Sequence, residues 1–129
     1  MPTIQNIPME LKINDHKKIF AIQEDFNSFF PYLKLEFFSK PRYSVGATAK
    51  KLLSTDSRSL AECRTIKHKE DLIINPSMTV IDLEKKFREV FGLGIQVFRK
   101  SGKAWLETTL TDNWTLEEQN RQGEALSKG

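Results

Sequence analysis

One cysteine and one histidine lie close together in the sequence, and this pair is the first candidate for chemistry. Cys63 and His68 are five residues apart, with Glu62 and Glu70 beside them. A thiol acts as a catalytic nucleophile when a base contacts it and a third group orients that base. On a strand, residues five apart lie on opposite faces and about 17 Å from each other. The spacing therefore favours a small, buried, apolar role for Cys63 over a catalytic one.

A metal site is the second candidate, because imidazole, thiolate and carboxylate groups all bind zinc. His16 and His68 are the only histidines of the chain, and Cys63 is its only cysteine. Their spacings match no metal-binding motif. The sequence therefore predicts neither a metal site nor a cofactor.

Phosphate chemistry and hydrolase chemistry are not indicated either. The "GLG" segment (92–94) follows a predicted helix instead of opening one, so it does not have the form of a phosphate-binding loop. The chain also lacks the sequence pattern of a nucleophile elbow. We therefore predict that the protein is not an enzyme. A site between two parts of the chain, lined by convergent polar groups, stays open as a rival interpretation.

The composition is that of an ordinary globular protein. The chain has 129 residues, 39% of them hydrophobic, which predicts one domain or two very small lobes with a shared core. It carries 20 Lys and Arg against 17 Asp and Glu, a net charge of +3. The cations come in short runs, most of them beside acidic residues, which favours a mixed solvated surface over a phosphate-binding stripe.

The same composition sets expectations about location. A single cysteine excludes an internal disulfide and favours a reducing compartment. The segment "MPTIQNIPMEL" (1–11) lacks the basic start and apolar run of a signal peptide. No apolar stretch approaches the roughly 20 residues that span a bilayer. We therefore expect a cytoplasmic protein without membrane contact.

The sequence repeats itself when it is shifted by 61 positions. The shift aligns residues 10–13 with 71–74 and the apolar positions of 19–30 with those of 80–91, and one further residue of gap aligns two later strands. A different shift matches "TDSRSLAE" (55–62) with "TDNWTLEE" (111–118). Because the order of matched segments is the same in both parts, we interpret the pattern as an internal duplication. The aligned apolar pairs include Leu11 with Leu72, Ile13 with Ile74, Ile19 with Val80, Phe26 with Phe87, Leu33 with Ile95 and Leu35 with Val97.

Each predicted copy contains a short strand, a helix and a second strand. In the later copy the helix stripe runs from residue 80 to 91 at the 3.6-residue period, with Ser77 or Thr79 as its cap and Gly92 as its end. In the earlier copy Asn14 or Asp15 is the expected cap and Pro31 the expected stop. The second strands cover 33–38 and 94–100. A partner strand (103–109) follows in the later copy, whereas the earlier copy has a predicted short helix near 46–53.

The later copy resembles a known family. "LIINPSMTVIDLEKKF" (72–87) resembles the stretch of ubiquitin-like β-grasp proteins in which the second strand runs into the central helix. "GKAWLETTLTDNWTLEEQN" (102–120) is similar to the family's hairpin and the short helical turn after it. The resemblance spans about residues 62–120. It implies a helix on one face of a small sheet, and partner binding through the open face.

The chain departs from that family after residue 120. "RQGEALSKG" (121–129) is a poor closing strand, and we expect the last residues to fray. The paired glycines of the family's flexible C-terminal tail are also missing. No conjugation chemistry is therefore carried over to this chain.

The hairpin "VFRKSGKAWLETT" (97–109) has apolar residues on both predicted faces. A two-residue turn at Ser101 and Gly102 would place Lys100 opposite Lys103, and Phe98 opposite Trp105. One face would then lie under the helix stripe. The residues expected on the other face are Gln96, Phe98, Lys100, Lys103, Trp105 and Glu107.

Two interpretations of that face stay open. The first half of the chain could pack over Phe98 and Trp105, since aromatic residues are more often core than interface. Alternatively, the face binds a partner, because Trp and Arg are enriched at interface hot spots. We predict the second role for Gln96, Phe98, Lys100, Lys103 and Trp105.

The sequence thus predicts an α+β fold with two related strand–helix–strand halves, residues 1–64 and 65–129. Each half is expected to be β-grasp-like, with a helix on one face of a small mixed sheet, and the two to form one compact unit. The expected function is that of an intracellular, non-enzymatic, protein-binding or adaptor module. The alternative is a nucleic-acid-binding protein that uses a basic, aromatic sheet face.

Overall fold

The computed structural model describes residues 10–38, 57–67 and 70–128, and these residues form an α+β fold. The predicted fold class is therefore confirmed. The short helix expected near 46–53 lies outside the described residues, as does His68. The elements in chain order are β1 (Leu11–Ile13), α1 (Ile19–Phe29), β2 (Leu33–Phe38), α2 (Leu60–Cys63), β3 (Leu72–Ile74), α3 (Val80–Phe91), β4 (Gly94–Ser101), β5 (Ala104–Glu107), a 3₁₀ turn (Thr109–Thr111) and α4 (Leu116–Lys128).

The described strands form two small sheets, and both are antiparallel. β1 pairs with β3, and β2, β4 and β5 form a three-stranded sheet in that order. Each sheet therefore joins strands from residues 1–64 with strands from 65–129. The expectation of mixed sheets is wrong for the described strands, because every pairing among them is antiparallel. The sequence leaves open whether the halves share a sheet, and the structure shows that they share both.

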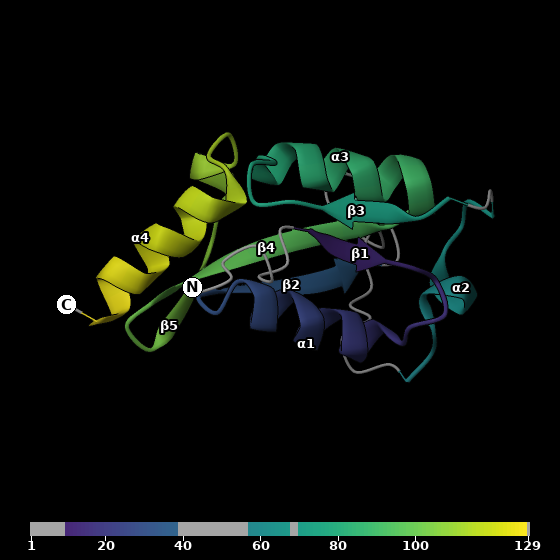
Figure 1. Ribbon diagram of the computed structural model, residues 1–129, viewed down its shortest axis with the longest axis horizontal. Helices are drawn as coiled ribbons and strands as arrows, with labels where there is room; N and C mark the ends of the chain where they lie inside the picture. Colours follow the sequence, from purple (N-terminus) through teal and green to yellow (C-terminus); the bar gives the residue numbers. More distant parts are fainter. Residues whose placement is uncertain (1–9, 39–56, 68–69, 129) are drawn as a thin grey trace, which may run out of the picture.

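Figure 1 shows how the elements are layered. The β1–β3 pair lies between α1 and α3, and β2 and β4 run behind that pair. α4 lies at the far end of the sheet, where it packs mainly against β4. None of the described helices is long and apolar enough to cross a membrane.

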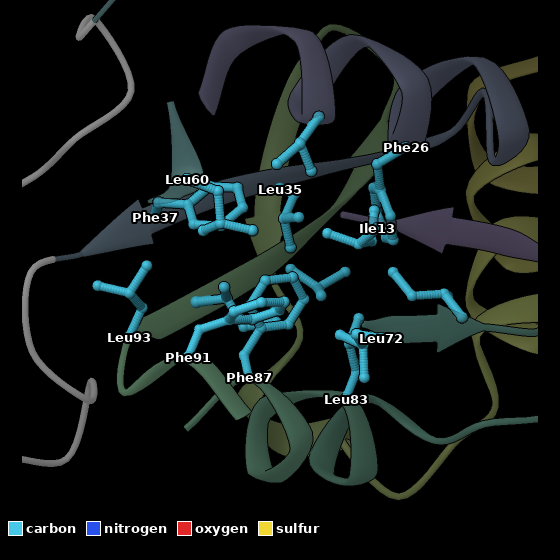
Figure 2. Close-up of a cluster of buried hydrophobic side chains, with 14 of the residues drawn as sticks. Ile13, Phe26, Leu35, Phe37, Leu60, Leu72, Leu83, Phe87, Phe91 and Leu93 are labelled. Atoms are coloured by element: carbon cyan, nitrogen blue, oxygen red, sulfur yellow. The ribbon is translucent and has the colours of Figure 1, made fainter. Parts of the chain in front are cut away.

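The core fills the space between the sheet and helices α1 and α3 (Figure 2). Phe37 of β2 and Phe87 of α3 meet edge to face, with ring centroids 5.4 Å apart. Phe87 also contacts Phe91 at 5.4 Å. Burying one large apolar side chain stabilises a fold by about 1.5–3 kcal/mol. These contacts therefore hold the first and second halves of the chain together.

Helices α3 and α1 begin in different ways. The hydroxyl of Thr79 accepts a hydrogen bond from the backbone N–H of Asp82 at 3.1 Å, and Gly92 ends α3 with φ +70°, as predicted. α1 begins only at Ile19 and has no side-chain cap, so the expected cap at Asn14 or Asp15 is wrong. Asn14 instead accepts a hydrogen bond from a backbone N–H two residues later, which stabilises the turn before the helix.

The end of the chain differs from the sequence-based expectation, because α4 continues to Lys128. Leu116, Gln119 and Gly123 are buried on one side of this helix, at a spacing that lays them along the sheet. A Cβ on Gly123 would lie only 2.8 Å from the Cβ of Tyr32. The glycine that weakens the helix in isolation therefore permits its close packing on the sheet.

The short helix α2 is held by a capping box. The carboxylate of Glu62 accepts a hydrogen bond from the backbone N–H of Ser59 at 2.8 Å, and the Ser59 hydroxyl accepts one from the N–H of Glu62. The hydrogen bond from the Ser59 backbone is the largest cause that lowers the pKa of Glu62, followed by that from the Ser59 side chain.

This capping box predicts a pH dependence of stability. A carboxyl whose pKa is lower in the folded state stabilises the fold above its unfolded pKa of about 4.3. That stabilisation is lost as the pH falls through the pKa that Glu62 has in the folded state. We expect Glu62→Gln to show a smaller loss of unfolding free energy than the wild type in urea titrations between pH 7 and pH 3. Ser59→Ala removes only the side-chain bond and keeps the larger backbone one, so its loss should lie between those of Glu62→Gln and the wild type. A wild-type slope for Glu62→Gln would contradict the assignment.

Candidate functional site

The hairpin of β4 and β5 has a different register from the predicted one. Ser101 lies opposite Ala104, so the turn consists of Gly102 and Lys103. Gly102 has φ +62°, and a two-residue turn with glycine at its first central position suits the twist of the strands. The predicted pairs of Lys100 with Lys103 and of Phe98 with Trp105 are therefore wrong.

The observed register moves the pairing by two positions, so the two faces keep their residues. Lys100 lies opposite Trp105, and Phe98 lies opposite Glu107. Phe98 and Trp105 remain on the same face as diagonal neighbours. On the opposite face, Val97 is fully buried in the core.

We call the face that points away from α1 and α3 the aromatic face, and define it by Lys34, Phe98, Lys100 and Trp105. Among the described elements, no helix packs against it. Phe98 and Trp105 are partly buried, and neither belongs to the continuous core.

The other two predicted residues lie at the two ends of the aromatic face. Gln96 is buried, and its side-chain amide donates a hydrogen bond to the carbonyl of Val97 at 3.0 Å. Lys103 is exposed in the turn. Of the five predicted residues, three therefore lie together, one is buried beside them, and one borders them.

Lys34 of β2 is the residue of this face that sequence reasoning missed. It lies opposite Phe98 in the ladder, and its ammonium nitrogen is 5.3 Å from the Phe98 ring and 5.2 Å from the Trp105 ring. Lys100 approaches the same Trp105 ring at 5.9 Å. Ammonium groups at these distances are attracted to the ring faces by about 0.5–1 kcal/mol each when exposed. The two aromatic side chains are thus held between lysines.

A polar hollow of about 440 Å³ is the second candidate site. It lies where β1, α2 and the segment before β3 meet. Its one buried charged group is Arg64, whose guanidinium contacts the Asp15 carboxylate at 3.0 Å and donates to the Val90 carbonyl at 2.9 Å. These groups bind each other and hold the fold. The hollow is lined by Asp15, His16, Ala61, Arg64, Glu70 and Asp71.

The residues first considered for chemistry are not brought together. Cys63 is partly buried and packs against the core, as a small apolar residue would. His16 is exposed at the polar hollow. Within residues 10–38, 57–67 and 70–128, no three His, Cys, Asp or Glu side chains are grouped so that they could hold a metal ion.

Comparisons of the chain with protein-family models, with curated proteins and with solved structures find no match. The function must therefore be argued from the geometry of the aromatic face itself.

Proposed function

We propose that the protein is a small, non-enzymatic interaction module that binds another protein through the aromatic face. The observation that carries this proposal is the position of the Lys34 ammonium over both Phe98 and Trp105, on a sheet face that no described helix covers. Lysines that hold two aromatic rings in place reduce the entropy lost on binding. Trp in such a position is a typical hot-spot residue. The single cysteine supports an intracellular setting for this role.

We further propose that the module consists of two related halves, residues 1–64 and 65–129. The strand pairs support this. Lys12 pairs with Ile73, which is 61 positions later, and Leu35 pairs with Val97, which is 62 positions later. Both offsets are those of the sequence repeat. In the β1–β3 pair and in the β2–β4 pair, a residue of the first half therefore lies opposite its repeat equivalent in the second half. The order β1, α1 and β2 in the first half is repeated as β3, α3 and β4 in the second, which supports related halves. The order of β3, α3 and the β4–β5 hairpin is the part that the β-grasp resemblance covers.

Matching contacts between the start of α1 and that of α2, and between the start of α3 and that of α4, support the same proposal. Isolated β-bridges join Lys18 to Ser59 and Thr79 to Thr115. Ser59 and Thr115 are equivalent in the "TD" repeat, and each precedes a helix. Backbone hydrogen bonds match in the same way. The bond from Ile19 N–H to the Arg58 carbonyl corresponds to that from Val80 N–H to the Trp114 carbonyl. The bond from Leu60 N–H to the Lys17 carbonyl corresponds to that from Leu116 N–H to the Met78 carbonyl.

The filled space between the halves favours a binding role over catalysis. Phe37 and Phe87 meet there in the core, as Figure 2 shows. The polar hollow is the nearest alternative, but its buried Arg64 is bound by protein groups. A catalytic site needs a nucleophile or base in contact with an orienting group, and the hollow supplies no such pair among the described residues.

Nucleic-acid binding is the second candidate function. Trp105 is partly exposed between two lysines, and nucleobases stack on exposed aromatic rings beside cations. However, the Lys34 ammonium already lies over the Trp105 ring, so a nucleobase would have to displace it in order to stack there. The aromatic face is therefore better suited to a protein.

A photo-crosslinking amino acid at position 103 tests the proposed function. Lys103 is exposed at the border of the aromatic face, so we expect discrete protein adducts in cells that produce the protein. The same amino acid in place of Lys85, which is exposed on α3, is the matched control and should give none of these adducts. Adding Phe98→Ala and Trp105→Ala should reduce the yield about tenfold or more, because hot-spot truncation costs about 2 kcal/mol or more.

Three outcomes would contradict this proposal. The first is the absence of protein adducts at position 103. The second is adducts with nucleic acid alone, whose yield falls steeply as salt rises, since salt weakens phosphate contacts. The third is a Phe98→Ala/Trp105→Ala variant that melts far below the wild type, which would place both rings in the core.

A further inference from the structure

The two edges of the three-stranded sheet differ in how far they are closed. At the β2 edge, two of the backbone carbonyls that point away from β4 are bonded by side chains of α1. The amide of Asn27 donates to the Leu33 carbonyl at 2.8 Å, and the amide of Gln23 donates to the Leu35 carbonyl at 2.9 Å. This edge is therefore not available to an incoming strand.

The β5 edge is open by the same criterion. The backbone N–H of Thr108 donates to the carbonyl of Val97, which shows that Leu106 and Ala104 also point their backbone groups toward β4. Trp105 and Glu107 consequently point their N–H and C=O groups away from the sheet. No described residue bonds these groups, and three of the four residues of β5 are exposed.

Unpaired positive charge borders this open edge. Neither Lys100 nor Lys103 has a carboxylate within ion-pair distance among the described residues, whereas Lys34 lies 3.7 Å from Glu36. Glu107 is the only carboxylate of β5 itself. On the other face, the Leu106 side chain is 42% exposed.

We propose that the β5 edge binds an extended acidic segment of a partner protein, which adds to the sheet as a further strand. The segment would place carboxylates on the aromatic face, where they reach Lys100 and Lys103, and an aliphatic side chain against Leu106. This inference rests on the proposed protein-binding function and names the chemistry of the partner. A second copy of β5 is the rival occupant, because an antiparallel pair centred on Trp105 would place each Lys103 opposite a Glu107. It fits less well because these pairs use the only carboxylate of each β5 and leave both Lys100 side chains without one.

A synthetic peptide of sequence GSTVEVESG, labelled with fluorescein, tests this inference by fluorescence polarisation. In an antiparallel pair its threonine lies opposite Glu107 and its glutamates lie opposite Trp105 and Lys103, so no two carboxylates face each other directly. We expect the peptide to bind the wild-type chain, and Lys100→Glu/Lys103→Glu to weaken binding about tenfold or more. Lys85→Glu/Lys86→Glu changes the net charge equally on exposed positions of α3 and should bind like the wild type. Equal weakening by both variants would overturn the assignment to β5.

Backbone pairing is tested by N-methylation of the same peptide. In this antiparallel pair, directly opposite residues exchange both hydrogen bonds, so the N–H groups of the threonine and the first glutamate would bond Glu107 and Trp105, while the valine N–H groups point outward. Methylating the amides of the threonine and the first glutamate should abolish binding, and methylating the valine amides should preserve it. In the complex, exchange of the Trp105 and Glu107 amides with solvent should slow by a factor of about ten or more. Exchange at Leu106, already bonded to β4, should change little.

The outcomes separate this inference from the function on which it rests. Protein adducts at position 103 without peptide binding, or with binding that survives methylation of the threonine and first glutamate amides, would overturn strand addition and leave the interaction module standing. Absence of both adducts and peptide binding would overturn both proposals. Self-association that protects the Trp105 amide without peptide would assign the edge to a second copy.

Discussion

Replacing Arg64 with alanine is expected to lower the unfolding free energy by about 3 kcal/mol, because it removes one partner of a buried ion pair. The Arg64 side chain is 3% exposed. Its guanidinium contacts the Asp15 carboxylate and donates to the carbonyls of Ile66 and Val90. It also lies 4.7 Å from the Phe91 ring. One side chain thus joins the turn after β1, the segment after α2 and the end of α3.

Urea titration at neutral pH measures this loss. The matched control is Arg121→Ala, which removes an exposed pair with Glu118 at 62% side-chain exposure and should cost at most about 0.5 kcal/mol. Arg64→Lys should recover only part of the stability, because an ammonium lacks the planar fork that reaches three acceptors. A loss below about 1 kcal/mol for Arg64→Ala would contradict a structural role for this ion pair.

Helix α3 shows what the sequence can predict. Its apolar stripe, its Thr79 cap and its Gly92 end are local features, since each depends on residues within one or two turns. The full length of α4 is harder to predict, because Gly123 breaks the helical pattern. The reason for a glycine there lies in the close approach of Tyr32, which is remote in sequence. Local periodicity carries no information about such a contact.

The aromatic face could be predicted only in part for the same reason. Alternation along the hairpin predicts Phe98 and Trp105 on one face. This prediction is correct although the predicted register is wrong, because a shift of two positions leaves every side chain on the same face. Lys34 could not be assigned to them, since that requires the pairing of β2 with β4. The open β5 edge likewise depends on which carbonyls α1 covers at the other edge. Pairings between distant segments therefore define the candidate site.

Gly92→Ala is expected to cost about 2–4 kcal/mol, because two separate effects act at this position. Gly92 has φ +70°, a left-handed conformation that costs about 1–2 kcal/mol for a residue with a Cβ. Its new Cβ would also lie 1.9 Å from the Thr65 hydroxyl oxygen and 3.2 Å from the Ile66 backbone nitrogen. Relief requires the Thr65 side chain to rotate, which breaks its 3.0 Å hydrogen bond to the Gly92 carbonyl.

Gly102→Ala separates the two effects. Gly102 has a similar φ of +62°, but a Cβ there would meet nothing within 4 Å, so its loss should be only about 1 kcal/mol. Thr65→Ala should rescue part of the Gly92→Ala loss, with a coupling energy of about 1 kcal/mol or more in a double-mutant cycle. Equal losses for the two glycine variants, or no rescue, would mean that the segment after α2 does not pack against the end of α3. That packing also positions the Arg64 guanidinium, so the same result would remove the structural basis of its ion pair with Asp15.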